Sequence, residues 1–307
     1  GAVSMGSLHS VATQTSTAGN VAVNISGTIT TTGNNSPALV AQSIGGGGGW
    51  VAQANGQVDL GSFSVTNDSD VSAGEISITS SSDLLTQGDN STGLLAQSIG
   101  GGGGFLGINK TVYRTYLGGN QAGLANAGNV TIDNTGAIST FGDNSAALIA
   151  QSIGGGGGSA ALIGSPDPTI NPGVHELGLL AIDTSSSNAG NLNVSNTSNL
   201  ITSGNGSPAL LLQSIGGGGG VVQALNNPEV PSITFGYKKL RGTTLEGASA
   251  SAGSIQFTST GGSTIATAGD RSAAAILQSI GGGGGWALID SLTTSNLGAQ
   301  QTEQGSV

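Results

Sequence analysis

The chain contains one eight-residue string five times: Gln-Ser-Ile followed by five glycines. The copies begin at Gln42, Gln97, Gln151, Gln213 and Gln278. Self-similarity at a long period is typical of repeat architectures, in which each unit buries its apolar face only against its neighbours. The string therefore predicts a stack of equivalent units rather than a globule with one central core.

Alignment outward from the glycine runs defines five blocks of nearly constant length. They are residues 18–49, 73–104, 127–158, 189–220 and 252–285. The segments between them differ in length, and insertions of that kind on a constant frame are well tolerated in repeat proteins. We expect one repeat domain over residues 1–307, cut from a longer protein.

The first part of each block alternates larger apolar residues with small or polar ones. Val21, Val23 and Ile25 alternate with Ala22 and Asn24, and period two indicates a strand. An apolar stretch after each glycine run, and a later apolar-glycine pair, indicate further strands in the variable segments. These pairs are Leu60-Gly61, Leu117-Gly118, Leu177-Gly178, Phe235-Gly236 and Leu297-Gly298.

One segment of the block has two interpretations. Residues 36–45 resemble a short helix, because Ser36 suits an N-cap and Pro37 the first helical position; residues 207–216 show the same pattern. About seven residues make a marginal helix. Apolar residues in both alternation phases, as at Leu210, Leu211 and Leu212, favour a strand covered on both faces.

The charge and the amino-acid composition of the chain exclude several classes of partner and site. The chain has 6 basic and 16 acidic residues, a net charge of −10, so the phosphates of nucleic acid would be repelled. It has no cysteine for a disulfide or a thiolate site, and no apolar run reaches the roughly 20 residues that span a bilayer. The first residues lack the charged and apolar regions of a signal peptide.

The block pattern Ala-Gly-x-Val-x-Val, then Gly-x-Ile-x-Thr, then Ala-Leu-x-Ala-Gln-Ser-Ile-Gly-Gly-Gly-Gly-Gly resembles the glycine-rich repeats in passenger regions of bacterial autotransporters (type V secretion). The resemblance covers essentially the whole chain, five times over. It implies an all-β fold, a parallel β-solenoid exported through an outer-membrane barrel and displayed outside the cell. Such passengers are often adhesins and some carry enzymes, and the resemblance does not choose between them.

Equivalent positions of a stack form columns, so the five Gln residues and the five following Ile residues are candidate columns. Since one coil of a solenoid takes about 20 residues, we expect intervening coils to separate the Gln residues and prevent direct contact. The same reasoning predicts some ten coils, a rod on the order of 50 Å.

Five consecutive glycines are costly, because glycine loses roughly 1 kcal/mol relative to alanine in regular structure. A flexible surface loop is one interpretation. We favour an ordered run in which side chains would block close backbone approach, so that runs from different units pair their N–H and C=O groups.

The Asn/Asp turns, such as Asp143-Asn144-Ser145, invite a calcium interpretation. Calcium needs six to eight oxygen ligands, and the nonapeptide spacing of calcium-binding repeats is absent. Left-handed turn geometry, which Asn and Asp tolerate, explains these residues without a metal. We predict no metal site and no cofactor.

Nothing in the sequence has the spacing of a catalytic site. His9 and His175 are the only histidines, and acid pairs such as Asp68 and Asp70 lie on variable segments. We therefore predict a non-enzymatic, structural or adhesive segment of a cell-surface or secreted protein, a right-handed parallel β-solenoid that self-associates into fibres. The alternative is a solenoid carbohydrate-active enzyme or ligand-binding passenger.

The expected partners are other copies of the chain, or a glycan or protein of a host or cell surface. Aromatic residues of the variable segments are the candidate contacts: Trp50, Tyr113, Tyr116, Tyr237 and Trp286. Their alternative role is to cover the core where each glycine run ends.

Overall fold

The computed structural model describes residues 2–5, 16–52, 57–61, 70–108, 114–120, 124–163, 176–182, 186–225, 230–238, 249–289 and 292–297. These residues form an all-β structure without a helix, and every pairing between its strands is parallel. The strands belong to five sheets.

The chain passes through the sheets in the same order each time. Sheet A contains β1 (Ala2–Met5), β6 (Gln57–Leu60), β11 (Arg114–Asn120), β17 (Glu176–Ile182), β23 (Val230–Lys238) and β29 (Leu292–Leu297). Sheet B contains β2 (Ser16–Thr17), β7 (Val71–Ser72), β12 (Leu124–Asn126), β18 (Ser186–Asn188) and β24 (Ser249–Ser251).

The glycine-run blocks supply the next two sheets and begin the fifth. Sheet C contains β3 (Val21–Thr31), β8 (Ile76–Thr86), β13 (Val130–Asn134), β14 (Ile138–Thr140), β19 (Leu192–Asn196), β20 (Leu200–Thr202), β25 (Ile255–Ser259) and β26 (Ile265–Thr267). Sheet D contains β4 (Leu39–Ile44), β9 (Leu94–Ile99), β15 (Leu148–Ile153), β21 (Leu210–Ile215) and β27 (Ala275–Ile280). Sheet E contains β5 (Gly48–Val51), β10 (Gly103–Ile108), β16 (Gly157–Ile163), β22 (Gly219–Leu225) and β28 (Gly284–Ile289).

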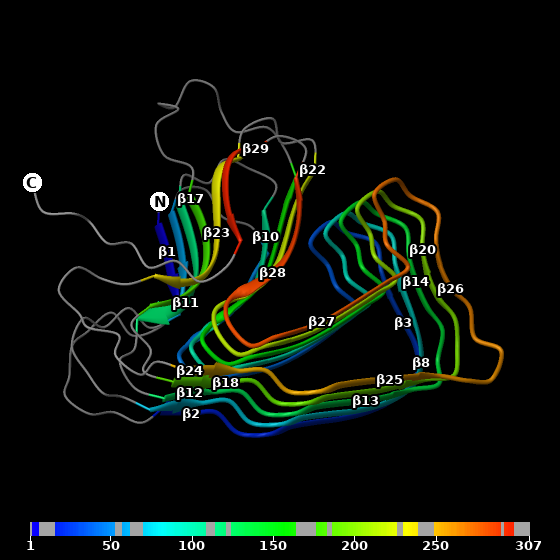
Figure 1. The fold of residues 1–307 in the computed structure, drawn as a ribbon. Helices are drawn as coiled ribbons and strands as arrows, with labels where there is room; N and C mark the ends of the chain where they lie inside the picture. The colour runs from blue at the N-terminus through cyan, green and yellow to red at the C-terminus, as the bar shows by residue number, and fades with distance from the viewer. Residues whose placement is uncertain are drawn as a thin grey trace, which may run out of the picture.

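One passage through sheets A to E is here called a circuit. Circuits 1 to 5 run over β1–β5, β6–β10, β11–β16, β17–β22 and β23–β28. Figure 1 shows equivalent strands lying one behind another, with sheet D (β27) crossing between the β14, β20 and β26 part of sheet C and sheet E (β28). Each of the five blocks lies in a separate circuit.

The expected coil of about 20 residues is wrong, because the chain visits five sheets before it returns to the first. Gln42 pairs directly with Gln97, and Gln97 with Gln151. The described chain therefore has five circuits instead of ten. At about 4.8 Å per strand spacing they extend roughly 25 Å along the stack.

The doubtful segment of the block is a strand, as predicted. Residues 39–44 form β4 and residues 210–215 form β21. Every side chain of β9, β15 and β21 is buried, in both alternation phases. Apolar cover on both faces explains why the alternating pattern disappears here.

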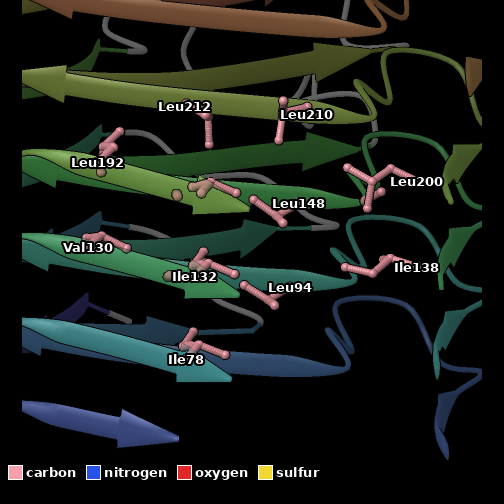
Figure 2. Close-up of a cluster of buried hydrophobic side chains, with 14 of the residues drawn as sticks. Ile78, Leu94, Val130, Ile132, Ile138, Leu148, Leu192, Leu200, Leu210 and Leu212 are labelled. Carbon is pink, nitrogen blue, oxygen red and sulfur yellow. The ribbon is translucent and has the colours of Figure 1, made fainter. Parts of the chain in front are cut away.

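Two apolar columns fill the space on either side of sheet D. The larger lies between sheets C and D and contains the inward residues of β8, β13, β19 and their partners, among them Ile78, Ile132 and Leu148. Figure 2 shows these side chains repeating from one circuit to the next. The opposite face of sheet D contributes Leu95, Ile149 and Leu211 to a second cluster with sheet E.

Sheet A and the inner face of sheet E enclose a third cluster, which includes Leu60, Leu106 and Leu117. The apolar residue of each apolar-glycine pair lies on a strand of sheet A, as predicted, with one shift of register; Gly298 lies outside the described residues. Leu117 pairs with Leu179 and not with Leu177. The strand in circuit 4 therefore has Leu179 and Leu180 where circuit 3 has Leu117 and Gly118.

Candidate functional site

The repeated string of Gln, Ser, Ile and five glycines is the strongest candidate for a functional element, and the structure assigns a contact to each part of it. Its first residue forms a continuous amide ladder along the stack. The Nε2 atoms of Gln42, Gln97, Gln151 and Gln213 each donate to Oε1 of the Gln in the next circuit, at 2.7, 2.6, 2.8 and 2.7 Å. Each Nε2 also lies 3.2–3.5 Å from the carbonyl oxygen of the last glycine of its own run.

This ladder corrects the expectation that the Gln residues would not touch. Gln97, Gln151 and Gln213 are completely buried, so water does not compete for their amides. All four bonds between the amides point the same way, with donors toward the C-terminal circuit. The ladder therefore has a polarity as well as a register.

The Ser of the string ties sheet D to the turn before sheet C. Ser98 Oγ donates to the Gly74 carbonyl oxygen (2.9 Å) and accepts from the Gly128 N–H (2.8 Å). Ser152 makes the same two contacts with Gly128 and Gly190, at 2.9 and 2.7 Å. Each hydroxyl therefore joins two consecutive circuits.

The Ile of the string forms a small apolar column of its own. Ile99, Ile153 and Ile215 are buried together, and Ile44 and Ile280 pack against them at the two ends. The predicted Ile column is confirmed.

The glycine runs are paired with one another, as the ordered interpretation predicted. Gly103 pairs with Gly48 and Gly157, and Gly104 with Gly49 and Gly158. A Cβ on Gly103 would lie 1.8 Å from the Gly157 carbonyl oxygen. Gly103 also has φ +131, a conformation that residues with a Cβ rarely adopt. Both the space and the backbone conformation therefore require glycine.

The Asn/Asp turns hold a left-handed backbone conformation and bond neighbouring circuits to each other. Asn35, Asn90 and Asn144 share φ 53, which Asn tolerates better than most residues. The residue before each of them offers its side-chain oxygen to the next circuit: the Asp143 N–H donates to Asp89 Oδ1 at 2.9 Å, and the Asn205 N–H to Asp143 Oδ1 at 2.7 Å. These oxygens thus serve the backbone of the stack.

A second side-chain ladder follows the same turns. The N–H of Ser91 donates to Ser145 Oγ and the N–H of Ser145 to Ser207 Oγ, both at 2.9 Å. This ladder was not predicted from the sequence, and the Ser at a fixed position after each Asn/Asp pair was the available signal. Among the described residues, no three His, Cys, Asp or Glu side chains lie in a group that could hold a metal ion.

The five candidate contact residues do not form one surface. Trp50 and Trp286 occupy the same column of sheet E, at opposite ends, through the pairs Trp50–Phe105 and Val221–Trp286. Trp50 is 41% exposed, whereas Trp286 packs against the cluster on sheet D. Tyr116 is buried at 7% exposure, so little of it is available to a partner. Tyr237 lies on β23, and Tyr113 lies outside the described residues.

The two histidines and Asp68 also lie outside the described residues, while Asp70 Oδ1 accepts from the Leu124 N–H at 2.9 Å. Comparison of the chain with family models, with curated proteins and with solved structures finds no match. The part of the chain that the structure describes includes no helix suited to crossing a membrane.

Proposed function

We propose that the chain is a non-enzymatic structural segment of a cell-surface or secreted protein, and that its circuits form a right-handed parallel β-solenoid. The observation that carries this proposal is the use of the repeated string. Its Gln, Ser, Ile and Gly residues all contact equivalent or adjoining residues of neighbouring circuits. A motif repeated for ligand binding or catalysis would present such groups to solvent or to a cleft.

The buried ladders support a stiff, shape-persistent element. Hydrogen-bonded polar columns in a dry interior fix the register of every strand, because a one-residue slip would leave each amide without its partner. Each circuit is bonded to its neighbours at two separate places, through the Gln ladder of sheet D and through the Ser ladder of the turns. The segment is thus suited to holding other parts of a protein away from a surface.

The location outside the cell rests on the resemblance of the repeated pattern to autotransporter passenger repeats. The proposed role is a stalk or adhesive surface, with a glycan or protein of a host or cell surface as the partner class.

Two measurements test this function. In hydrogen exchange, the amides of 154–158 should be protected far beyond free peptide values, since the runs pair between circuits. An antibody to the chain should label intact cells of the source organism, and external protease should remove the label. Exchange at free-peptide rates would refute the rigid stack, and label found only after lysis would refute the surface location.

A further inference from the structure

We propose that an apolar patch on the outer face of sheet C binds a basic peptide segment of a partner protein, in which large apolar side chains stand between lysine or arginine residues. The patch consists of Leu85, Phe141 and Ile201 and is called the Phe141 patch. The inference rests on the proposed function and names the chemistry of its protein partner. The three residues belong to circuits 2, 3 and 4, so each has a further circuit on both sides.

The alternation of sheet C turns these side chains away from the core. Leu84 and Leu200, which precede Leu85 and Ile201, are buried in the column between sheets C and D. Successive side chains of a strand point to opposite faces, so Leu85 and Ile201 point outward. Leu85 is partly exposed and Ile201 is 36% exposed. Phe141 follows β14 directly and is 53% exposed.

The register of sheet C brings the three side chains together. Leu85 and Ile201 both pair with Ser139, one from each neighbouring circuit, so each lies about 4.8 Å from it along the stack. The ladder continues to Phe141, whose N–H donates to the Thr86 carbonyl oxygen at 3.0 Å. Phe141 is therefore about 6.6 Å from Ser139 on the same face. Figure 1 shows β14 and β20 on the side of the stack farthest from sheet A.

Large apolar side chains are unusual at the outward positions of this sheet. The earlier outward residues of β8 are exposed and polar: Ser77, Thr79, Ser81 and Asp83. Among the described residues of circuits 2 to 4, the exposed large apolar side chains are Leu124, Phe141 and Ile201, and the last two are neighbours. Single exposed apolar residues are normal on a protein surface, whereas a group of them with a polar rim marks an interaction site.

The rim of the Phe141 patch is acidic. Asp83 is the outward residue before Leu85, and Asp143 lies in the turn after Phe141, bonded to Asp89 of circuit 2. Residues 70–108, 124–163 and 186–225 contain no Lys or Arg, and their carboxylates belong to Asp70, Glu75, Asp83, Asp89, Asp133 and Asp143. Complementary charge at an interface selects the partner, so the occupant of this patch carries basic residues.

The same chemistry argues against other occupants. Nucleic acid and an anionic lipid surface would be repelled. A second copy of the chain, with its net charge of −10, would bring further carboxylates to the contact. A neutral glycan would cover the Phe141 ring and leave the carboxylates without a counter-charge. A lysine or arginine can pair with Asp83 or Asp143, and it can also lie over the face of the ring, a position that attracts cations.

The circuits themselves supply substitutions of the patch that keep the fold. Phe141→Ser introduces the residue that circuit 4 has at this position, Ser203, and Ile201→Ser copies Ser139 of circuit 3. Neither Phe141 nor Ile201 belongs to a buried apolar cluster of the described chain. Both variants should therefore fold like the unaltered chain.

Neutral variants of the rim retain the hydrogen bonds of the stack. The Oδ1 atom of Asp83 accepts from the Ala137 N–H at 2.9 Å, and that of Asp143 from the Asn205 N–H at 2.7 Å. In circuit 4, Asn199 and Asn205 make the equivalent bonds through an amide oxygen. Asp83→Asn and Asp143→Asn thus remove charge and keep the acceptor.

The experiment is a nuclear magnetic resonance titration of the isotope-labelled 307-residue chain with a synthetic probe, the peptide Gly-Ser-Lys-Leu-Phe-Leu-Lys-Ser-Gly. The amide signals of Leu85, Phe141 and Ile201 should shift with probe concentration. Phe141→Ser should weaken binding about ten- to a hundredfold, the effect of removing one large buried apolar side chain. The double variant Asp83→Asn, Asp143→Asn should weaken it about two- to tenfold at low salt and reduce its salt dependence.

The controls separate the patch from charge in general. Glu75→Gln removes a carboxylate just before β8 and keeps an oxygen for Asn129 Nδ2, which donates to Glu75 Oε1 at 3.0 Å. This variant should bind the probe like the unaltered chain. Two altered probes test the ligand chemistry, one with Glu in place of Lys and one with Ser in place of Leu and Phe. Both should bind at least about tenfold more weakly than the probe.

Probe binding that Phe141→Ser leaves unchanged would overturn the inference, as would the absence of any signal shift at the patch. Equal binding of the acidic probe would overturn the assignment of a basic partner. Tighter binding of a neutral oligosaccharide at the same signals would replace the peptide by a glycan. Circular dichroism and amide exchange distinguish these outcomes from failure of the proposed function, since a protected stack that binds no probe refutes only the inference.

Discussion

The amide ladder allows a quantitative prediction for Gln151→Leu in the central circuit. Gln151 is completely buried and makes four polar contacts. Its Nε2 donates to Gln213 Oε1 at 2.8 Å and lies 3.4 Å from the Gly158 oxygen, and its Oε1 accepts from Gln97 Nε2 at 2.6 Å and Ser159 Oγ at 3.1 Å. Leucine keeps the volume approximately and removes all four.

The expected cost follows from the groups that lose a partner. One N–H of Gln97 and the Oε1 of Gln213 remain buried without the bond that Gln151 supplied. Each buried group left unsatisfied costs about 1–3 kcal/mol, so the free energy of unfolding should fall by roughly 2–6 kcal/mol. The buried hydroxyl of Ser159 also loses its acceptor, which adds to this cost.

Gln42→Leu in the first circuit is the matched comparison. It removes the single ladder bond from Gln42 Nε2 to Gln97 Oε1 (2.7 Å), and leaves one buried group in place of two. Its cost should be about half as large, near 1–3 kcal/mol.

Urea unfolding followed by circular dichroism measures both variants, with the slope of each transition checked against the unaltered chain. Equal costs at residues 151 and 42, or no measurable cost at residue 151, would contradict the assignment of the ladder as a stabilising element. A changed slope would mean that the circuits no longer unfold together, as happens in long repeat arrays.

Three further variants test other columns of the stack. A Cβ on Gly101 would lie 2.4 Å from the Gly155 carbonyl oxygen, whereas one on Gly282 meets nothing within 4 Å. Gly101→Ala should therefore destabilise the chain strongly or prevent folding, and Gly282→Ala, at the same place in the string, should be nearly neutral in the 307-residue chain; equal thermal midpoints for the two would contradict the close-approach explanation. Ser80→Asn should raise the free energy of unfolding by about 1 kcal/mol, because its amide can donate to Asn134 Oδ1, a buried atom without a partner in the described chain, and denaturant midpoints no higher than those of Ser80→Ala would argue against it. Gln151→Glu buries a carboxylate, which raises its folded-state pKa above the unfolded value; the destabilisation should be full at neutral pH and diminish as the pH falls through that raised pKa, so a cost independent of pH would exclude a charged group in the ladder.

The sequence determined the composition of each column. Identical strings at a long period fix which residues become equivalent, so the Ile column, the paired glycine runs and the left-handed Asn turns followed from the residues alone. The strand at 39–44 could be predicted despite its helical local signals, since apolar residues in both phases need cover on both faces. Local pattern is sufficient for these features because each depends on one short segment and its own copy.

Only the tertiary structure decided which residues of the repeated blocks contact one another. Whether Gln97 touches Gln151 depends on the number of sheets that the chain visits per circuit, and loops of different length hide that number in the sequence. The shifted pairing of Leu117 with Leu179 has the same cause, because pairing between distant strands is chosen by the closure of the whole circuit. The direction of the ladders is likewise a property of the stacked circuits, since a single Gln or Ser can donate toward either neighbour until the register fixes which acceptor lies within reach.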